Sequence, residues 1–291
     1  MTGIAYEPHE LMITRIAAEI TEVPEHVVVM GSFTPLAYAA YMLARMTQAP
    51  DAWMIGYNAI GVLPIELSFA GTEGAIYKGS LASGSFVENG NVVHLNTRGL
   101  LECVSSAQMD GSGAINLSVI GPYDHPKVRL PGGAGAPEVI QNYRKVVAYF
   151  AQHDARTLVS EVDFVTGRRT PVAAEARSAK GLVGGPIIVV TPKAVLRKDD
   201  EGPFRVESVT RGIDVQDVVD STGFSLQIPD VTPYTVEPTS EQLTLLRDQI
   251  DPFCTARFDF LKGPERLDYL AAILAKEWDR ARSQLTSTDE A

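Results

Sequence analysis

The stretch SSAQMDGSGAINLSVIGPYDHPKVRLPGGAGAPEVIQ, residues 105–141, carries the most structural information in the chain. Its apolar run AINLSVI predicts a strand, and Pro122 and Pro126 predict a turn after it. A glycine-rich loop at residues 132–135 then leads into a helix whose first turn holds Pro137. The order of strand, loop and helix indicates an α/β protein.

The residues before this stretch show the same alternation. The segment HELMITRIAAEI, residues 9–20, has apolar residues at helical spacing, and HVVVMGS at residues 26–32 is typical of a buried strand that ends in a turn. A second helix is expected at residues 34–46, with Thr34 as its N-cap. The run AWMIGYNAIG, residues 52–61, predicts a further strand.

The residues after the glycine loop continue the pattern. Apolar runs predict three strands, at residues 145–151, 185–192 and 204–210. A short helix is predicted at residues 214–223 with Gly223 as its stop, and residues 73–98 read as loops with irregular β structure. Together these elements predict one α/β domain, residues 1–262, with an open, mostly parallel sheet and flanking helices. Ligands of such sheets bind beyond the carboxyl ends of the strands.

The composition excludes several classes of protein. The chain has 291 residues and a formal net charge of -11, which disfavours nucleic acid and anionic membranes as partners. No apolar run approaches the roughly 20 residues of a membrane span, and the N-terminus lacks the features of a signal peptide, so a cytoplasmic protein is expected. The two cysteines, Cys103 and Cys254, and five scattered histidines show no metal-ligand spacing.

The last segment, residues 263–291, stands apart from this domain. It opens with Pro264 and predicts a C-terminal amphipathic helix. One face of that helix would carry Leu267, Leu270, Ala271, Leu274, Trp278, Ala281 and Leu285. Such a face packs either on its own domain, which is the simpler expectation, or on a partner subunit.

The glycine loop has two interpretations on spacing alone. Glycines allow backbone amides to approach a ligand closely, and a helix N-terminus favours an anion or a developing oxyanion. A tight turn without any ligand would use the same residues.

Longer motifs favour a ligand site. The chain contains AQMD at residues 107–110 and IGPYDHPKVR at 120–129, followed by the glycine loop. These motifs resemble the β subunit of glutaconate CoA-transferase and its relatives in CoA-transferase family I. The similarity extends through further segments, VVVMGSFTPLAYAA (27–40), QHDARTLVSEVDFVTG (152–167), GPIIVVTPKAVLRKDD (185–200), VQDVVDSTGFSL (215–226) and LRDQIDP (246–252).

This resemblance implies a fold, a partner and a site. In the family, an open α/β β subunit of the NagB-RpiA type pairs with a similar α subunit as αβ or α2β2, and the active site lies at their junction. The substrate is an acyl-CoA thioester, so coenzyme A enters as part of the substrate and no cofactor is bound permanently. The residues expected to contact it by this resemblance are Gly31, Gln108, His125, Gly132, Gly133, Ala134 and Gly135.

Ala134 departs from the family pattern, because it interrupts an adjacent pair of glycines. Alanine keeps the amide donor but restricts φ, so we expect donation from this residue only if its φ is negative.

The family's nucleophile is a glutamate that follows an early strand, and it attacks the thioester to form a glutamyl-CoA intermediate. The matching position in this chain is Tyr57, whose phenol cannot form that intermediate. The tripeptide ENG at residues 88–90 looks like the family's local signature, but Glu88 lies only 19 positions before Ala107 and reads as a solvated turn residue. Glu66 is the other candidate acid, and a structural role is expected for it.

Several other polar residues of the shared segments have a structural interpretation as well as a functional one. Asp124 and His125 could form a catalytic pair, but an ordering role in the turn is favoured. His153 and Asp163 are expected to orient loops. Lys127 and Arg129 face either CoA phosphates or solvent.

The sequence therefore predicts the β subunit of a heteromeric acyl-CoA enzyme. Because Tyr57 replaces the nucleophile, the expected reaction is hydrolysis, C–C cleavage or decarboxylation with an acid–base residue from the α subunit, as in divergent relatives. Two alternatives stay open: CoA transfer through another carboxylate, and a non-catalytic structural subunit.

Overall fold

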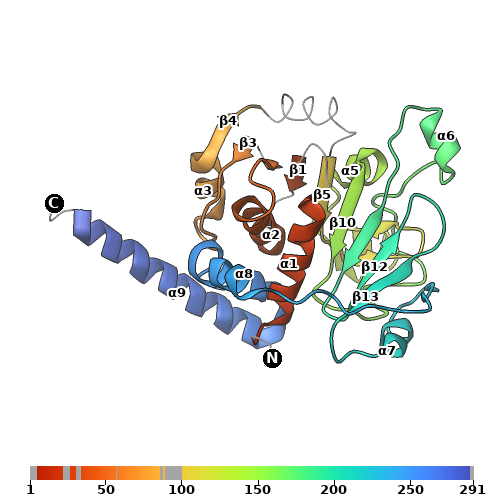
Figure 1. The fold of residues 1–291 in the computed structure, drawn as a ribbon. Coiled ribbons are helices and arrows are strands. Elements are labelled where there is room, and N and C mark those ends of the chain that lie inside the picture. Colours follow the sequence, from red (N-terminus) through yellow and green to blue (C-terminus); the bar gives the residue numbers. More distant parts are fainter. Residues whose placement is uncertain are drawn as a thin grey trace.

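A nine-stranded sheet organises the chain (Figure 1), with the strand order β13-β12-β11-β10-β5-β1-β2-β3-β4. The computed structural model describes residues 5–21, 27–30, 34–56, 58–85, 88 and 100–288. The strands of this sheet are β1 (Val27–Met30), β2 (Trp53–Gly56), β3 (Ala59–Val62), β4 (Ser80–Ser83), β5 (Leu100–Val104), β10 (Lys145–Tyr149), β11 (Ile187–Val190), β12 (Ala194–Lys198) and β13 (Arg205–Val209).

The centre of the sheet is parallel and its two margins are antiparallel. Strands β2, β1, β5, β10 and β11 run in the same direction. Strands β3 and β12 reverse direction at either side. The prediction of an open, mostly parallel sheet is thus confirmed. The parallel strands end at one edge, where Met30 of β1 pairs with Gly56 of β2 and with Cys103 of β5.

Helices cover both faces of this sheet. They are α1 (Pro8–Thr21), α2 (Pro35–Met46), α3 (Thr72–Gly79), α5 (Ala136–Asn142), α6 (Ala174–Ser178), α7 (Val215–Asp220), α8 (Ser240–Leu245), the π-helical turn η2 (Leu246–Ile250), the 3-10 helix η3 (Thr255–Phe260) and α9 (Gly263–Thr288). The predicted helices at residues 9–20 and 34–46 correspond to α1 and α2. Thr34 occupies the N-cap position of α2, but its side chain makes no capping hydrogen bond.

Two apolar cores lie on opposite faces of the sheet because side chains alternate along each strand. One core packs α1 and α2 against Leu101 and Cys103 of β5. The other packs α5 against Leu100 of the same strand and Val146 of β10. The strands of the centre are therefore apolar on both sides, as parallel strands require.

The predicted strand at residues 52–61 is wrong in one respect, because it is an antiparallel hairpin. Ile55 of β2 pairs with Ile60 of β3. The predicted loop region from residue 73 also contains helix α3 and strand β4. Two glycines weaken the helix signal there, and burial of Ile76 stabilises the helix through tertiary packing.

The predicted strand at residues 114–120 is divided into β7 (Ile115–Asn116) and β8 (Val119–Ile120). The buried Asn116 turns the chain, since its Oδ1 accepts hydrogen bonds from the backbone of Ser118 at 3.0 Å and Val119 at 3.3 Å. β7 pairs with β6 (Gln108–Met109), and β8 pairs with β9 (Val128–Arg129).

The role predicted for Gly223 is also corrected. Helix α7 ends at Asp220, and its N-cap Asp214 accepts a hydrogen bond from Gln216 N. A Cβ on Gly223 would lie 2.6 Å from the carbonyl oxygen of Leu158. Glycine is required there by close packing of two backbones.

Helix α9 runs along one side of the domain and extends past it at its C-terminal end (Figure 1). Its contacts with the domain come from Tyr269, whose hydroxyl donates to Cys254 O at 2.9 Å, and from the buried Ile273. Both Glu277 carboxylate oxygens accept backbone hydrogen bonds, from Phe69 N at 2.5 Å and Ala70 N at 3.0 Å. Within the described residues, no helix, α9 included, is both long and apolar enough to cross a membrane.

Candidate active site

The edge at which the parallel strands end is where the site is expected. Gly56 ends β2 and Met30 ends β1, side by side. The two candidate residues that follow these strands, Tyr57 and Gly31, lie outside the described residues. The candidates from residue 108 onward are described, and the site is built from them.

The glycine loop is held by two of its backbone hydrogen bonds. Gly132 has a φ of +104°, and its N–H donates to Leu117 O at 2.8 Å. Gly133 O accepts from Ala136 N at 2.7 Å, which starts helix α5 with Gly135 as its N-cap. Pro137 and Glu138 lie in the first turn of α5, as the sequence predicts.

Ala134 has a φ of +43°, in the left-handed region. The expectation that this residue donates to a ligand depends on a negative φ, and that condition is not met. An alanine in this region costs about 1 kcal/mol relative to an ordinary conformation. The strain is tolerated because the residues on both sides are fixed by the backbone contacts above.

Three consecutive N–H groups of this loop have no acceptor in the part of the chain that the structure describes. Among the described residues, none accepts a hydrogen bond from the backbone N–H of Gly133, Ala134 or Gly135. Ala134 and Gly135 are exposed. The loop is therefore open, with N–H groups that are able to donate hydrogen bonds to an anionic or carbonyl oxygen.

A second segment, residues 165–167, forms the wall behind the loop. A Cβ on Gly133 would lie 2.5 Å from the methyl carbon of Thr166. Thr166 Oγ1 accepts a hydrogen bond from Leu117 N at 2.9 Å and contacts Ser118 Oγ at 2.8 Å. A Cβ on Gly167 would lie 2.9 Å from Ala136 O. Glycine at both positions lets the loop and this wall touch.

A buried amide network supports both segments. Gln108 Oε1 accepts from Asn116 Nδ2 at 2.7 Å and from Asp163 N at 3.0 Å. Asp163 Oδ2 accepts from Gly121 N at 2.8 Å. Gln108 is buried, so its amide oxygen is committed to the protein, and Asp163 orients the next turn as predicted. Both side chains hold the loops in position.

The turn of the β8–β9 hairpin, residues 121–127, is exposed beside the loop. The Tyr123 ring stacks on Phe164 with centroids 5.3 Å apart, and the Arg129 guanidinium lies 5.0 Å from the same tyrosine ring. His125 and Asp124 are exposed, and no hydrogen bond or ion pair joins their side chains in this described turn. They do not form a catalytic pair here.

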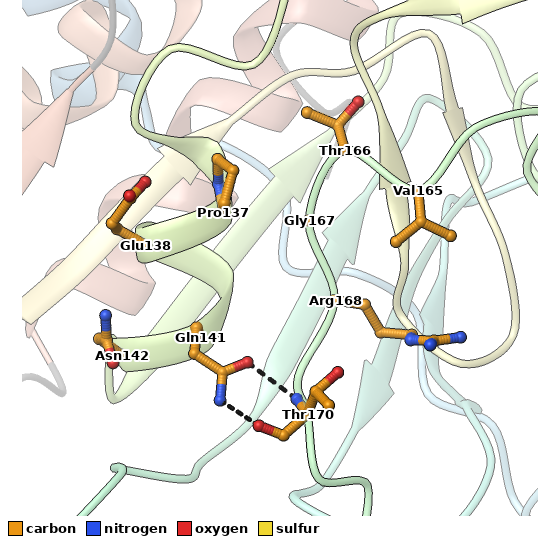
Figure 2. A pocket seen from close by; sticks show the side chains of 9 residues that line it. All are labelled: Pro137, Glu138, Gln141, Asn142, Val165, Thr166, Gly167, Arg168 and Thr170. Atoms are coloured by element: carbon orange, nitrogen blue, oxygen red, sulfur yellow. Dashed lines mark hydrogen bonds between the residues drawn. The ribbon is translucent and has the colours of Figure 1, made fainter. Parts of the chain in front are cut away.

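A pocket of about 400 Å³ opens between α5 and the wall segment (Figure 2). It is lined by Pro137, Glu138, Gln141, Asn142, Val165, Thr166, Gly167, Arg168 and Thr170. Gln141 closes its lower end, because its amide exchanges two hydrogen bonds with the Thr170 backbone, at 2.5 and 2.8 Å. The pocket shares Thr166 and Gly167 with the wall of the glycine loop, so loop and pocket form one continuous surface.

The two alternative carboxylates lie elsewhere. Glu88 is exposed and accepts a hydrogen bond from Ser85 N at 2.7 Å; this bond and the Ser85 hydroxyl lower the pKa of its carboxyl group. Glu66 pairs with Arg280 of α9 at 2.8 Å. The first caps its own turn and the second anchors the C-terminal helix.

A third carboxyl group, Glu102 in the middle of β5, is not singled out by the sequence analysis. Its side chain is 6% exposed, and its Oε2 has no hydrogen-bond partner among the described residues. Burial raises the pKa of Glu102 well above its ordinary value. In the register of the sheet, Glu102 pairs with Val29 of β1 and Val146 of β10. A buried acid thus lies on the strand between β1 and β10.

His153 is structural in this arrangement. Its Nδ1 lies 2.8 Å from Thr191 Oγ1 and its Nε2 lies 3.0 Å from Thr222 Oγ1. Burial, with a smaller contribution from the charge of Lys193, lowers the pKa of His153 to about 4. The imidazole therefore stays neutral and ties together the loops after β11 and α7, in keeping with the predicted orienting role.

Sequence reasoning missed three contributors to the site: Asn116, Thr166 and Gly167. The first shapes the strand break before the loop, and the other two form its wall. A signal was present, because Thr166 and Gly167 lie inside the shared segment at residues 152–167 and Asn116 lies between the AQMD and IGPYDHPKVR motifs. The sequence motif alone does not say which residue of a shared segment touches the loop. Within the described residues, no cluster of three or more His, Cys, Asp or Glu side chains is able to hold a metal ion.

Comparison with known proteins identifies the family of this chain. A family model described as Coenzyme A transferase matches residues 12–221. One subunit of the 3-oxoadipate CoA-transferase of Pseudomonas knackmussii is 29% identical over 249 residues, which cover 84% of this chain and 93% of that protein. The corresponding subunit of the glutaconate CoA-transferase of Acidaminococcus fermentans is 28% identical over 258 residues, covering 85% and 93%.

A third relative is named for a different reaction. The IpdB subunit of the cholesterol ring-cleaving hydrolase of Mycobacterium tuberculosis is 28% identical over 230 residues, which cover 77% of this chain and 88% of that protein. Among solved structures, the decarboxylase AibA/AibB matches with a TM-score of 0.75 and 22% identity, covering 87% of this chain and 98% of that one. The last similarity shows the shared fold.

Proposed function

The chain belongs to the coenzyme A transferase family, and from this premise we propose that it is the β subunit of a heteromeric enzyme that acts on an acyl-CoA thioester without forming a glutamyl-CoA intermediate. The reaction is hydrolysis, C–C cleavage or decarboxylation. The α subunit completes the site in an αβ or α2β2 assembly and supplies the acid–base residue.

The observation that carries this proposal is that the candidate carboxylates of this chain are engaged in structural contacts. By the resemblance to the family, Tyr57 stands at the position of the nucleophile. Glu88 is exposed in its own turn, and Glu66 is paired with Arg280. An attacking carboxylate must be both ionised and free to reach a thioester carbonyl. The described carboxylates that the transfer alternative needs are occupied by structural contacts.

The open loop supports a catalytic role over a purely structural one. A loop collapsed onto its own side chains would have favoured a structural subunit instead. The N–H groups of Gly133, Ala134 and Gly135 donate to none of the described residues. In the proposed reaction the N–H groups of Gly133 and Gly135 stabilise the oxygen of the substrate carbonyl as negative charge develops on it.

The support from Gln108 is indirect. Its amide oxygen is committed to Asn116 and Asp163, so in this proposal Gln108 positions the loop. We assign Gly133 and Gly135 to the carbonyl oxygen, and Gly31, Tyr57 and His125 to the rest of the CoA ester; Ala134, with its positive φ, is left out of the donor set. Coenzyme A enters and leaves as part of the substrate, and no permanent cofactor is required.

The names of the relatives support more than one reaction. Two are CoA-transferase subunits and one belongs to a ring-cleaving hydrolase. CoA transfer through an unorthodox carboxylate is therefore the competing proposal, and the experiment is designed to separate it from ours.

The test is intact-mass analysis of the complex of this chain with its α subunit after incubation with a panel of acyl-CoA esters. Borohydride treatment converts an enzyme–CoA thioester to a stable alcohol of altered mass. We expect no adduct on this chain, together with release of free CoA or of a shortened acyl-CoA. An adduct mapped to Glu88 or Glu66 would establish the transfer mechanism instead.

A matched pair of variants sharpens this test. Tyr57→Glu restores the family's nucleophile, and we expect it to form the trapped adduct that the natural chain lacks. Tyr57→Gln has nearly the same shape and no nucleophilic oxygen, so it should form none. If neither product nor adduct arises with any ester while the complex forms normally, the chain is a structural subunit.

A further inference from the structure

We propose that helix α9 is a dimerisation helix, which pairs antiparallel with α9 of a second copy of this chain. The proposal concerns the outer face of the helix and is independent of the reaction assigned above. It starts from apolar side chains that the fold leaves in solvent.

The face of α9 that carries the apolar stripe is not the face that packs on the domain. The domain is contacted by Tyr269, Ile273, Glu277 and Arg280. Six residues of the predicted apolar face form an exposed stripe, whose large members have exposed fractions of 68% for Leu267, 40% for Leu274, 65% for Trp278 and 69% for Leu285. The seventh residue of the predicted face, Leu270, is half-buried. A tryptophan and three leucines in solvent along one line exceed the scattered exposure of a monomer surface.

The stripe has the spacing of a helix-pairing seam. Its members follow each other at intervals of four, three, four, three and four residues and are Leu267, Ala271, Leu274, Trp278, Ala281 and Leu285. Both alanines are exposed as well. Alternating intervals of three and four keep the apolar line facing one partner helix over its whole length.

The order of side-chain sizes indicates that the partner is the same helix. Read from either end, the stripe runs large, small, large, large, small, large. A two-fold axis that crosses the stripe midway between Leu274 and Trp278 would place Leu267 opposite Leu285 and Leu274 opposite Trp278 of the second copy. The two alanines would also face each other. A symmetric dimer requires such a self-complementary surface, because each residue meets its counterpart twice.

Charges beside the stripe select the antiparallel orientation. Asp268 and Arg282 lie on the same edge of the stripe, near its two ends. In the antiparallel pair, Asp268 of each copy faces Arg282 of the other. A parallel pair would rely on Glu277 to meet Arg282, but both Glu277 carboxylate oxygens already accept hydrogen bonds from the loop at Phe69 and Ala70.

The position of α9 leaves room for this pairing. The helix runs along the domain margin and extends beyond it at its C-terminal end (Figure 1). In the antiparallel pair, each domain lies beside the projecting end of the other helix. The domain itself holds each helix in place through Ile273 and Glu277, so the seam is presented without first ordering a free segment.

A crosslinking experiment on the complex of this chain with its α subunit tests which chain pairs with α9 and how the two helices are aligned. Ala275 lies beside the axis, so a cysteine there faces its own counterpart. We expect Ala275→Cys with a short bismaleimide to yield a covalent dimer of this chain. The control Lys276→Cys, on the opposite side of the helix, and the natural chain with Cys103 and Cys254 should yield none. Crosslinking of Ala275→Cys to the α subunit alone, or to nothing, would overturn the proposal.

A charge-reversal cycle gives an independent readout. Asp268→Arg and Arg282→Asp each place like charges together, and we expect each to weaken self-association roughly tenfold in dilution experiments followed by light scattering. The double variant restores both pairs and should recover the affinity of the natural chain. Additive weakening in the double variant would contradict the antiparallel register.

Discussion

The glycine loop and helix α9 leave opposite kinds of groups unsatisfied. At the loop, buried amides and half-buried hydroxyls form hydrogen bonds with one another, while three backbone N–H groups have no acceptor among the described residues. On α9, the polar side chains that touch the domain are paired, while four large apolar side chains remain in solvent. Free N–H groups suit a small ligand with an electron-rich oxygen, and an apolar stripe suits another protein surface.

This difference shows which side of the loop and which side of α9 are stabilised by contacts within the chain. The loop is fixed from behind by Gln108, Asn116 and Thr166, so its donors are held before any ligand arrives. Helix α9 is fixed on its inner face by Ile273 and Glu277, so its stripe is presented as a rigid surface. In both regions one side is satisfied within the chain and the other is left for a partner.

The largest effect is expected from filling the contact behind the loop. Gly133→Val places side-chain carbon atoms where the Thr166 methyl group lies, since even a Cβ would come within 2.5 Å. The loop must shift, and we expect the acyl-CoA activity of the complex to fall roughly 10²-fold. Steady-state kinetics of the complex would measure this.

Gly135→Ala is the matched control for that variant. A Cβ on Gly135 meets nothing within 4 Å, the residue has a φ of -84°, and alanine keeps the N–H group. Its activity should remain within about twofold of the natural complex. Equal losses in both variants would mean that the loop tolerates no side chain at all, and would remove the specific role given to the Thr166 wall.

The second expected effect is a dependence of the free energy of unfolding on pH, caused by the titration of His153. Burial holds the pKa of His153 at about 4 in the folded chain, below its ordinary value of about 6.5. Below pH 6.5 the unfolded chain takes up a proton that the folded chain does not. The free energy of unfolding should therefore fall by about 3 kcal/mol as the pH drops from 6.5 to 4, and the contribution is fully present above that window.

Chemical denaturation at several pH values would check this expectation. His153→Gln keeps polar contacts to Thr191 and Thr222 and removes the titrating group. Its unfolding free energy should change less than that of the natural chain across the same window. An unchanged slope would assign the acid sensitivity to other groups.

The third expected effect is a difference in stability between variants on the two faces of α9. Glu277→Ala leaves the N–H groups of Phe69 and Ala70 without their acceptor, and we expect a loss of about 1 to 3 kcal/mol of unfolding free energy. Trp278→Lys, one position further, changes only an exposed side chain and should shift stability by no more than about 0.5 kcal/mol. Thermal unfolding of both variants at a concentration where the chain is monomeric would compare them.

A large destabilisation by Trp278→Lys under those dilute conditions would show that the stripe packs within its own chain. The distinction between an inner face that packs on the domain and an outer face that is exposed to a partner would then be wrong.

The smallest effect tests backbone strain in the loop. Ala134→Gly relieves a φ of +43°, which costs alanine about 1 kcal/mol, but it also increases the entropy of the unfolded chain. We expect a net gain of about 0.5 kcal/mol in unfolding free energy with the loop N–H groups preserved. A loss of stability would indicate that the alanine methyl group makes a contact that outweighs the strain.

Much of the fold followed from local patterns. The apolar spacing of residues 9–20 and 34–46 predicted α1 and α2, and the loop with Pro137 behind it predicted α5. Other elements did not follow. The run at residues 52–61 reads as one strand because both arms of its hairpin are apolar, and the break at Asn116 depends on hydrogen bonds from its side chain.

The candidate site was predicted at the level of segments. The sequence indicated the glycine loop and its helix, and the structure supplied Thr166 and Gly167 as the wall, 30 or more positions away along the chain. The buried acid at Glu102 was also missed, since a single acid in the run LLECV does not reveal whether its carboxyl group finds a partner.

What the sequence determined by itself is the order of strands and helices, the place of the glycine loop and the length of α9, because hydrophobic period, proline and glycine act on neighbouring residues. Only the tertiary structure decided which face of α9 meets the domain, that Ala134 takes a left-handed conformation and that Glu102 lies buried without a partner among the described residues. These three outcomes depend on contacts between distant segments, where packing and hydrogen bonding outweigh the preferences of any single residue.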